Sequence, residues 1–129
     1  MKPLSFPKKE RLKSNKAIEA IFYHGNSVFS FPIMAKFTLV TKTSNLEPLQ
    51  SVFVVPKRRI KKAAHRNKIR RRIKEAFRLN KEVLKNWADL NNTNVSLALV
   101  FVSSEMLTFQ IIEDSVKKII EQIIQGEEK

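Results

Sequence analysis

The chain contains no cysteine and only two glycines among its 129 residues. The lack of cysteine excludes disulfide bridges, a thiolate nucleophile and zinc sites built on sulfur ligands. The scarcity of glycine argues against a glycine-rich phosphate-binding loop. No apolar run approaches the roughly 20 residues that span a bilayer, and the first residues lack the apolar stretch of a signal peptide. We therefore expect a cytoplasmic protein with no membrane partner.

Positive charge is abundant and is concentrated in one part of the chain. The net charge is +13, and residues 57–78 hold 12 basic residues and one acidic residue, a local charge of +11. The other residues carry 13 basic and 11 acidic side chains, a net charge of only +2. Because concentrated like charge repels itself unless a polyanion neutralises it, nucleic acid is the expected partner.

The pattern of apolar residues predicts a single α/β domain over residues 1–129, beginning with a basic and flexible arm at 1–13. We expect helices at about 15–24, 65–88 and 109–125. We expect strands at about 33–41, 50–56 and 95–103, with a short strand before Pro32.

Two helix ends and one helix face carry further expectations. Gly25 stands where a left-handed helix cap belongs, and Thr108 can cap the last helix. The inner face of that helix should consist of its regularly spaced apolar residues, namely Ile111, Ile112, Val116, Ile119, Ile120, Ile123 and Ile124.

The segment HRNKIRRRIKEAFR at residues 65–78 combines seven basic residues with a regular apolar stripe. At about 100° per residue, the polar arc contains Asn67, Arg71, Lys74 and Arg78. The roughly opposite arc contains Ile69, Ile73, Ala76, Phe77 and Leu84. We expect the apolar arc to dock on the sheet while the cations face outward.

A solvated helix face would normally mix charges of both signs in i,i+4 pairs. Here only Glu75 opposes the run, and five of the seven cations are arginines, whose planar fork binds phosphate. The pattern therefore favours a surface that binds a polyanion. A basic helix packed on a sheet beside aromatic residues favours RNA over DNA, although composition alone leaves DNA open.

The string RNKIRRRIKEAFR closely resembles the arginine-rich signature of the protein subunit of bacterial ribonuclease P. The matching positions are Arg66, Asn67, Ile69, Arg70, Arg71, Ile73, Lys74, Glu75, Phe77 and Arg78. Lys68 stands where that family more often has arginine. The similarity extends upstream to KKERLKSNKAIEAIFYHGNSV and VVPKRRIKKAAHRN, so that it covers nearly the whole chain.

The resemblance implies an α/β sandwich of order αβββαβα with a small mixed sheet, as in the second domain of ribosomal protein S5. It also implies a left-handed βαβ crossover between parallel strands, which departs from the usual right-handed rule.

The resemblance also implies a function. That family assists a catalytic RNA, which acts as an endoribonuclease and removes the 5′ leader of precursor tRNA. The RNA subunit and Mg²⁺, held mainly by the RNA subunit and the substrate, perform the hydrolysis, so no catalytic or metal-binding side chain is expected here. The expected partners are ribonuclease P RNA and precursor tRNA, and DNA is not expected.

Carried over by position, the resemblance implies two groups of site residues. The expected contacts of the RNA subunit are Arg66, Asn67, Lys68, Arg70, Arg71, Lys74 and, more peripherally, Arg78. The expected residues of a leader cleft are Phe22 and Phe37, with Lys57 and Arg58 as phosphate contacts beside it. Ile18 stands where the family often has another aromatic residue, which predicts weaker stacking there.

Two other functions stay open. A structural RNA-binding protein of the ribosomal type would use the same basic helix without serving catalysis. A nuclease that works without an RNA subunit would need acidic residues paired around a metal, and Glu10, Glu19, Glu47 and Asp89 show no such spacing.

Overall fold

The computed structural model describes residues 15–41 and 49–128, and the arm predicted at 1–13 lies outside them. The described elements are α1 (Asn15–His24), β1 (Asn26–Ser30), β2 (Ile33–Thr41), β3 (Leu49–Val54), α2 (Ala63–Leu90), β4 (Thr93–Phe101) and α3 (Phe109–Glu128). The predicted αβββαβα order is therefore confirmed, and α2 runs two residues further than expected at each end.

The four strands form one mixed sheet in the order β1-β2-β4-β3. Strand β2 pairs antiparallel with both β1 and β4, whereas β3 pairs parallel with β4. Helix α2 is the crossover that connects these two parallel neighbours. The left hand expected for this crossover stays a prediction.

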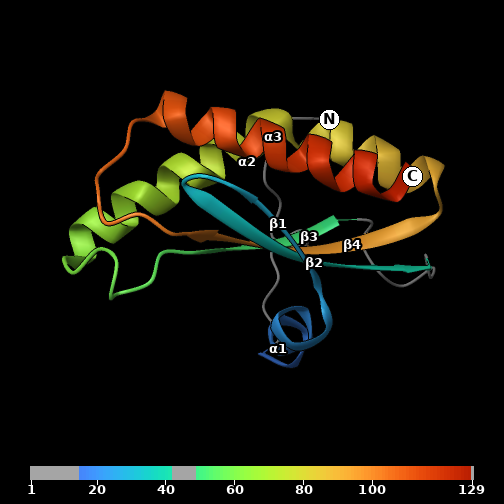
Figure 1. Cartoon of the computed structure of the whole chain (residues 1–129), viewed down its shortest axis with the longest axis horizontal. Coiled ribbons are helices and arrows are strands. Elements are labelled where there is room, and N and C mark those ends of the chain that lie inside the picture. Colours follow the sequence, from blue (N-terminus) through green and yellow to red (C-terminus); the bar gives the residue numbers. More distant parts are fainter. Residues whose placement is uncertain (1–14, 42–48, 129) are drawn as a thin grey trace.

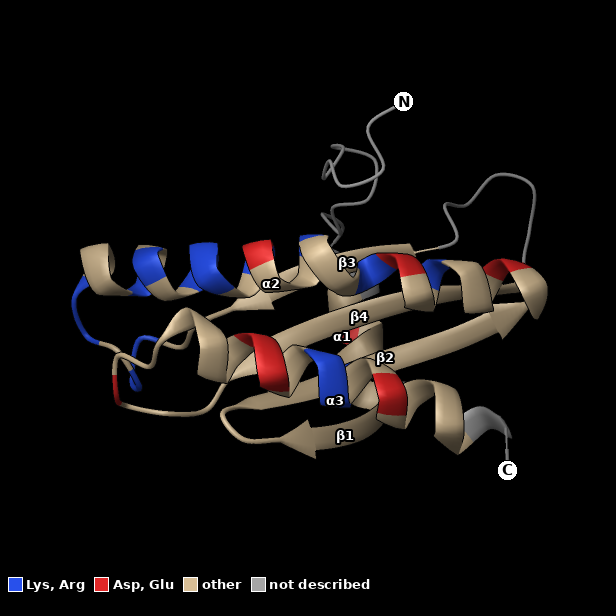
Figure 2. Cartoon of the chain, turned by 90° about the horizontal axis from the view of Figure 1, so that it is seen from above, with Lys and Arg blue, Asp and Glu red and all other residues tan. Residues whose placement is uncertain are grey.

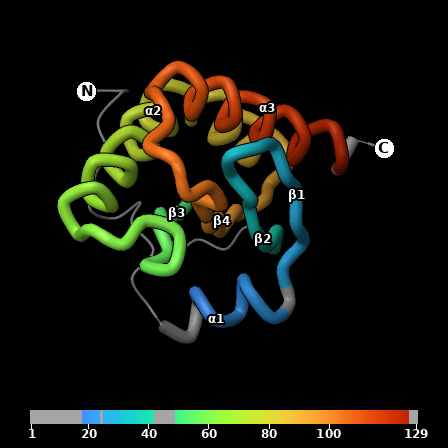
Figure 3. The backbone as a smooth tube through the Cα atoms, turned by 60° about the vertical axis from the view of Figure 1, so that its left-hand side comes forward, coloured from blue at the N-terminus to red at the C-terminus, as the bar shows by residue number. Residues whose placement is uncertain are grey.

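The helices cover the two faces of the sheet unequally. Helices α2 and α3 lie side by side on one face, and α1 lies alone on the other (Figures 1 and 3). The main core fills the space between the sheet and the α2–α3 layer, and a small second cluster lies under α1. Among the described elements, one face of the sheet is thus covered by two helices and the other by α1 alone.

The apolar stripe of α2 docks on the sheet as predicted. Its members Ile69, Ile73, Ala76, Phe77 and Leu84 are all buried. The Phe77 ring meets the ring of Phe53 on β3 edge to face, with the centroids 5.7 Å apart. Because this face is packed, the opposite face of α2 is the one that can meet a partner.

Strand β3 begins one residue before the strand predicted at about 50–56 and ends two residues before its expected end. Its side chains alternate between buried and half-buried along the strand. Leu49, Ser51 and Phe53 are buried, whereas Gln50, Val52 and Val54 are only half-buried. The difference arises because successive strand residues point to opposite faces, and one of these faces has only α1 over it.

Helix α3 begins at Phe109, and the Ile111 N–H donates to Thr108 Oγ1 at 3.4 Å, as the predicted cap requires. Most of the expected inner face is buried, and Ile124 is half-buried. Ile111 is 43% exposed, so its assignment to the inner face was wrong. At about 100° per residue, Ile111 lies roughly 120° from the centre of the buried stripe.

Gly25 ends α1, but the expected left-handed cap is wrong, because no described glycine has a positive φ. The Gly25 N–H donates to the Ile21 carbonyl at 2.9 Å. A Cβ at this position would lie 2.3 Å from the Ile21 oxygen and 2.7 Å from the Phe37 oxygen. Glycine is therefore required by the close approach of α1 to β2 and not by backbone handedness.

Candidate nucleic-acid interface

Cations gather on the first half of α2 and on the segment that leads into it, whereas acidic and basic residues alternate along α3 (Figure 2). Lys62 precedes α2 in an extended conformation and gives it no side-chain cap, and the first turn of α2 contains no acidic residue. The unsatisfied N–H groups at this end carry partial positive charge. Backbone and side chains therefore add to the same positive potential.

The structure confirms the two-sided character of α2. Of the residues expected to contact RNA, the exposed ones are Lys57, Arg58, Asn67, Lys68 and Arg71. The half-buried ones are Arg66, Arg70, Lys74 and Arg78. None of these cations lies in the core, and those on α2, together with Asn67, are here called the basic face. Their contact with RNA stays a prediction.

Two hydrogen-bonded pairs orient side chains along the basic face. Arg70 Nη1 donates to Asn67 Oδ1 at 2.8 Å. Arg78 donates through Nε and Nη2 to the two carboxylate oxygens of Glu75, at 2.9 and 2.6 Å. These bonds hold the pKa of Glu75 below its ordinary value and raise the pKa of Arg78. The only acidic residue among 57–78 is thus paired with a cation of its own helix.

Two arginines of α2 also fasten neighbouring segments to the helix. Arg66 Nη1 donates to the carbonyls of Ile60 and Lys61, at 3.1 and 2.7 Å, and so fixes the basic connection after β3. Arg72 Nη1 donates to the Leu107 carbonyl at 2.5 Å and fixes the loop before α3. Sequence reasoning did not reveal these roles, since their partners are backbone atoms that carry no sequence signal.

The second part of the candidate site lies on the sheet face under α1. Ile21 is buried against Ala98 of β4, with Ile18 and Val52 packed beside them. Phe22, one residue further along α1, is 38% exposed. Ile18 is thus largely used in docking α1, and the Phe22 ring is available to a partner.

Phe37 does not lie in a cleft with Phe22, and that expectation was wrong. It is 4% exposed and belongs to the main core under α2 and α3. The neighbouring Lys36 pairs across strands with Ala98, so Lys36 is the β2 residue on the α1 face. Strand alternation predicts that Lys36 and Phe37 face opposite sides of the sheet. The sequence does not show which of these sides α1 covers, so it could not identify Lys36 as the residue on the α1 face.

The described residues contain neither a metal-binding cluster nor a membrane-spanning helix. In residues 15–41 and 49–128, no group of three or more His, Asp or Glu side chains gathers closely enough to hold a metal ion. Within the same ranges, every helix is too short or too polar to cross a membrane.

Comparison with known proteins identifies the family. Residues 6–124 match the family model described as Ribonuclease P. The chain belongs to the ribonuclease P protein family. The ribonuclease P protein component of Porphyromonas gingivalis is 29% identical over 112 residues, which are 86% of this chain and 80% of that protein. That of Syntrophus aciditrophicus is 34% identical over 90 residues, which are 70% of this chain and 71% of that protein.

Solved structures of the ribonuclease P protein family share this fold. The RNase P protein from Thermotoga maritima aligns with a TM-score of 0.68 at 19% identity, covering 88% of this chain and 96% of that chain. At this identity the likeness establishes the fold alone. Members of the family are components of an endoribonuclease that acts in tRNA processing, and the family predicted from the signature on α2 is confirmed.

Proposed function

We propose that the chain is the protein subunit of a ribonuclease P ribonucleoprotein. It binds the catalytic RNA with the basic face of α2 and the 5′ leader of precursor tRNA with the sheet face under α1. The observation that carries the proposal is the row of exposed and half-buried cations on a helix whose opposite side is buried, in a chain of this family.

Electrostatics supplies the physical reason for such a subunit. The catalytic RNA and the precursor tRNA are both polyanions and repel each other. A local charge of +11 over residues 57–78 lowers this repulsion and releases counterions from both RNAs. The stabilisation it provides should therefore fall steeply as salt is added.

The face under α1 is suited to an unpaired leader. Phe22 offers an exposed ring on which a base can pack, and Lys36 places a half-buried cation on the same face. Lys57 and Arg58 are exposed just beyond the end of β3 and can contact phosphates. Ile18 has no ring to offer and contributes less to base packing. The leader would thus be held beside a ring and three cations.

In this proposal the protein positions RNA and carries no catalytic group. The RNA subunit and Mg²⁺, held mainly by RNA and substrate, hydrolyse one phosphodiester bond of the precursor. The residues of the basic face bind and orient the RNA subunit, while the α1 face orients the substrate through its leader.

Reconstitution tests the proposal. Purified protein added to ribonuclease P RNA should raise the rate of precursor tRNA cleavage at low Mg²⁺, and a mixture without the RNA subunit should not cleave. Binding to RNA without stimulation of cleavage would instead support the structural, ribosomal-type alternative. Cleavage by the protein alone would support a nuclease that needs no RNA subunit.

A further inference from the structure

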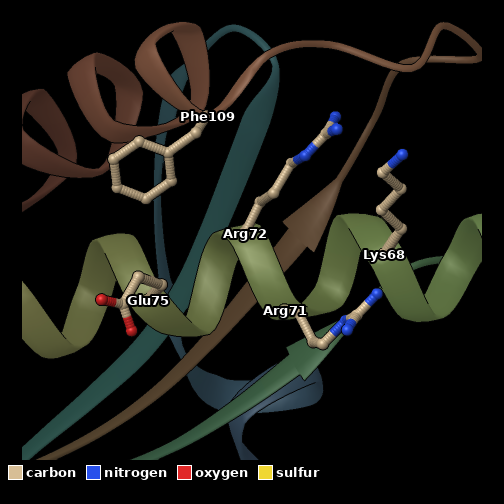
Figure 4. A pocket seen from close by; sticks show the side chains of 5 residues that line it. All are labelled: Lys68, Arg71, Arg72, Glu75 and Phe109. Atoms are coloured by element: carbon tan, nitrogen blue, oxygen red, sulfur yellow. The ribbon is translucent and has the colours of Figure 1, made fainter.

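A hollow lies where the first half of α2 faces the start of α3 (Figure 4). It is an open depression of about 290 Å³ lined by Lys68, Arg71, Arg72, Glu75 and Phe109. Its wall is mainly apolar, since Phe109 contributes its ring and long cationic side chains contribute their methylene stems. A surface with cations at the rim and carbon on the wall is chemically distinct from the rest of the basic face.

Hydrogen bonds and packing fix the walls of the hollow. Arg72 holds the loop before α3 through its 2.5 Å bond to the Leu107 carbonyl. Phe109, two residues later, is half-buried and packs against the main core. Glu75 is held by its two bonds to Arg78. The hollow is therefore formed before any partner arrives.

Lys68 and Arg71 remain as the exposed cations of this hollow. Neither of them forms a hydrogen bond or an ion pair with any residue that the structure describes. In Figure 4 Lys68 extends toward the side of the α3 loop, whereas Arg71 extends to the other side of α2. Lys68 and Arg71 thus lie on two sides of α2, and each can contact a phosphate of a bound polyanion.

The chemistry of the hollow selects among possible ligands. A small anion would gain from the cations but nothing from the apolar wall. A base-paired helix offers phosphates but keeps its bases stacked inside. An unpaired nucleotide offers both a flat apolar ring and flanking phosphates, and proteins commonly recognise such bases by stacking them on aromatic side chains.

We propose that the hollow accepts one unpaired base of the RNA bound by α2. The base packs against Phe109, and the phosphates on either side of it contact Lys68 and Arg71. This inference rests on the proposed function, because it takes the RNA subunit of ribonuclease P as the ligand. The hollow thus recognises an exposed base, whereas the rest of the basic face recognises only charge.

The test compares two RNA probes, ribonuclease P RNA and a perfectly paired RNA duplex. Phe109→Ala should weaken binding of ribonuclease P RNA about five- to tenfold, because one stacked base is lost. Binding of the duplex should be unchanged. The slope of log affinity against log salt should also be unchanged, since no charge is removed.

Two further variants distinguish the loss of the Phe109 ring from a loss of protein stability. Phe109→Leu keeps an apolar side chain against the core but removes the ring, and it should lose most of the same affinity. Ile111→Ala removes an exposed apolar side chain from the same turn of α3, outside the hollow, and should leave affinity unchanged.

A fluorescence readout reports the base directly. Trp87 is the only tryptophan of the chain, so Trp87→Phe combined with Phe109→Trp leaves one indole, located in the hollow. Its emission should be quenched by ribonuclease P RNA and not by the duplex.

The possible outcomes separate the two proposals. Unchanged affinity in Phe109→Ala and Phe109→Leu, or equal losses for both probes, overturns the base site and leaves the proposed function standing. Wild-type protein that fails to bind ribonuclease P RNA overturns both.

Discussion

Phe53 of β3 and Phe77 of α2 pack edge to face, with ring centroids 5.7 Å apart and ring planes inclined at 63°. This pair joins the helix that carries the basic face to the edge strand of the sheet. Phe77 is 1% exposed, so that its ring is entirely committed to this packing. The position of the surface cations thus depends on an apolar contact beneath them.

Phe77→Ala should lower the free energy of unfolding by about 3–5 kcal/mol, because it leaves a cavity under α2. Denaturant unfolding followed by circular dichroism measures this loss. Leu90→Ala is the matched control on the same helix, since Leu90 is 86% exposed, and it should change stability by less than about 0.5 kcal/mol. Equal effects of the two substitutions would contradict the assigned faces of α2.

Arg71→Ala combined with Lys74→Ala should weaken binding of ribonuclease P RNA without lowering the melting temperature. The slope of log affinity against log salt should fall by about two, because two phosphate contacts are lost. Lys117→Ala with Lys118→Ala is the control, as these exposed cations lie on α3 outside the basic face. A lost thermal transition in the first variant would show that Arg71 or Lys74 supports the fold.

Phe22→Ala should weaken binding of precursor tRNA to the reconstituted holoenzyme while leaving mature tRNA almost unaffected. The expected loss is about 1–3 kcal/mol, the contribution of one stacked base. Filter binding with both tRNAs measures the difference. Phe37→Ala should instead lower protein stability, because Phe37 lies in the main core. Equal losses for the two tRNAs would argue against a leader site under α1.

Gly25→Ala should destabilise the protein, since the new Cβ would press on backbone oxygens of Ile21 and Phe37. Neither oxygen can move without shifting α1 or β2. Gly126→Ala is the control, because nothing lies within 4 Å of a Cβ there, and replacing a helical glycine is neutral or slightly stabilising. Thermal melting of both variants checks the contrast, and a Gly25→Ala protein as stable as wild type would refute the close approach.

The Glu75–Arg78 pair should give stability a small dependence on pH. Arg78 donates to the Glu75 carboxylate and lowers the pKa of Glu75 below its ordinary value of 4.5. A group whose pKa is lowered by folding contributes stability above its unfolded pKa and loses it as pH falls through the folded pKa. The melting-temperature difference between wild type and Glu75→Gln should thus be present at neutral pH and decline as pH falls below 4.5. A difference that grows in acid would exclude this pairing.

The sequence was sufficient for α2, where two independent signals agree. Helical spacing places Ile73 and Phe77 on one side, and charge places Arg71 on the other. Both signals depend only on residues within the helix, and the packing of α2 on the sheet agrees with them.

The sequence was not sufficient for β2 and Gly25. Alternation separates Lys36 from Phe37, but the side on which α1 packs decides which of them lies on the candidate leader face. The need for glycine at position 25 depends on the carbonyl of Phe37, twelve residues away. The hollow beside Phe109 likewise depends on the bond from Arg72 to Leu107, which joins residues 35 positions apart.

The parallel pairing of β3 with β4 has a consequence for how the chain folds. In the described sheet, β4 is the single neighbour of β3. Helix α2 lies between these two strands in sequence. The two strands can therefore pair only when α2 packs onto the sheet. Crossovers of this length make folding slow, and the crowded cations of α2 resist that compaction. We expect sulfate or RNA to accelerate refolding by neutralising these cations, so that under the proposed function the RNA subunit would also help the protein to fold.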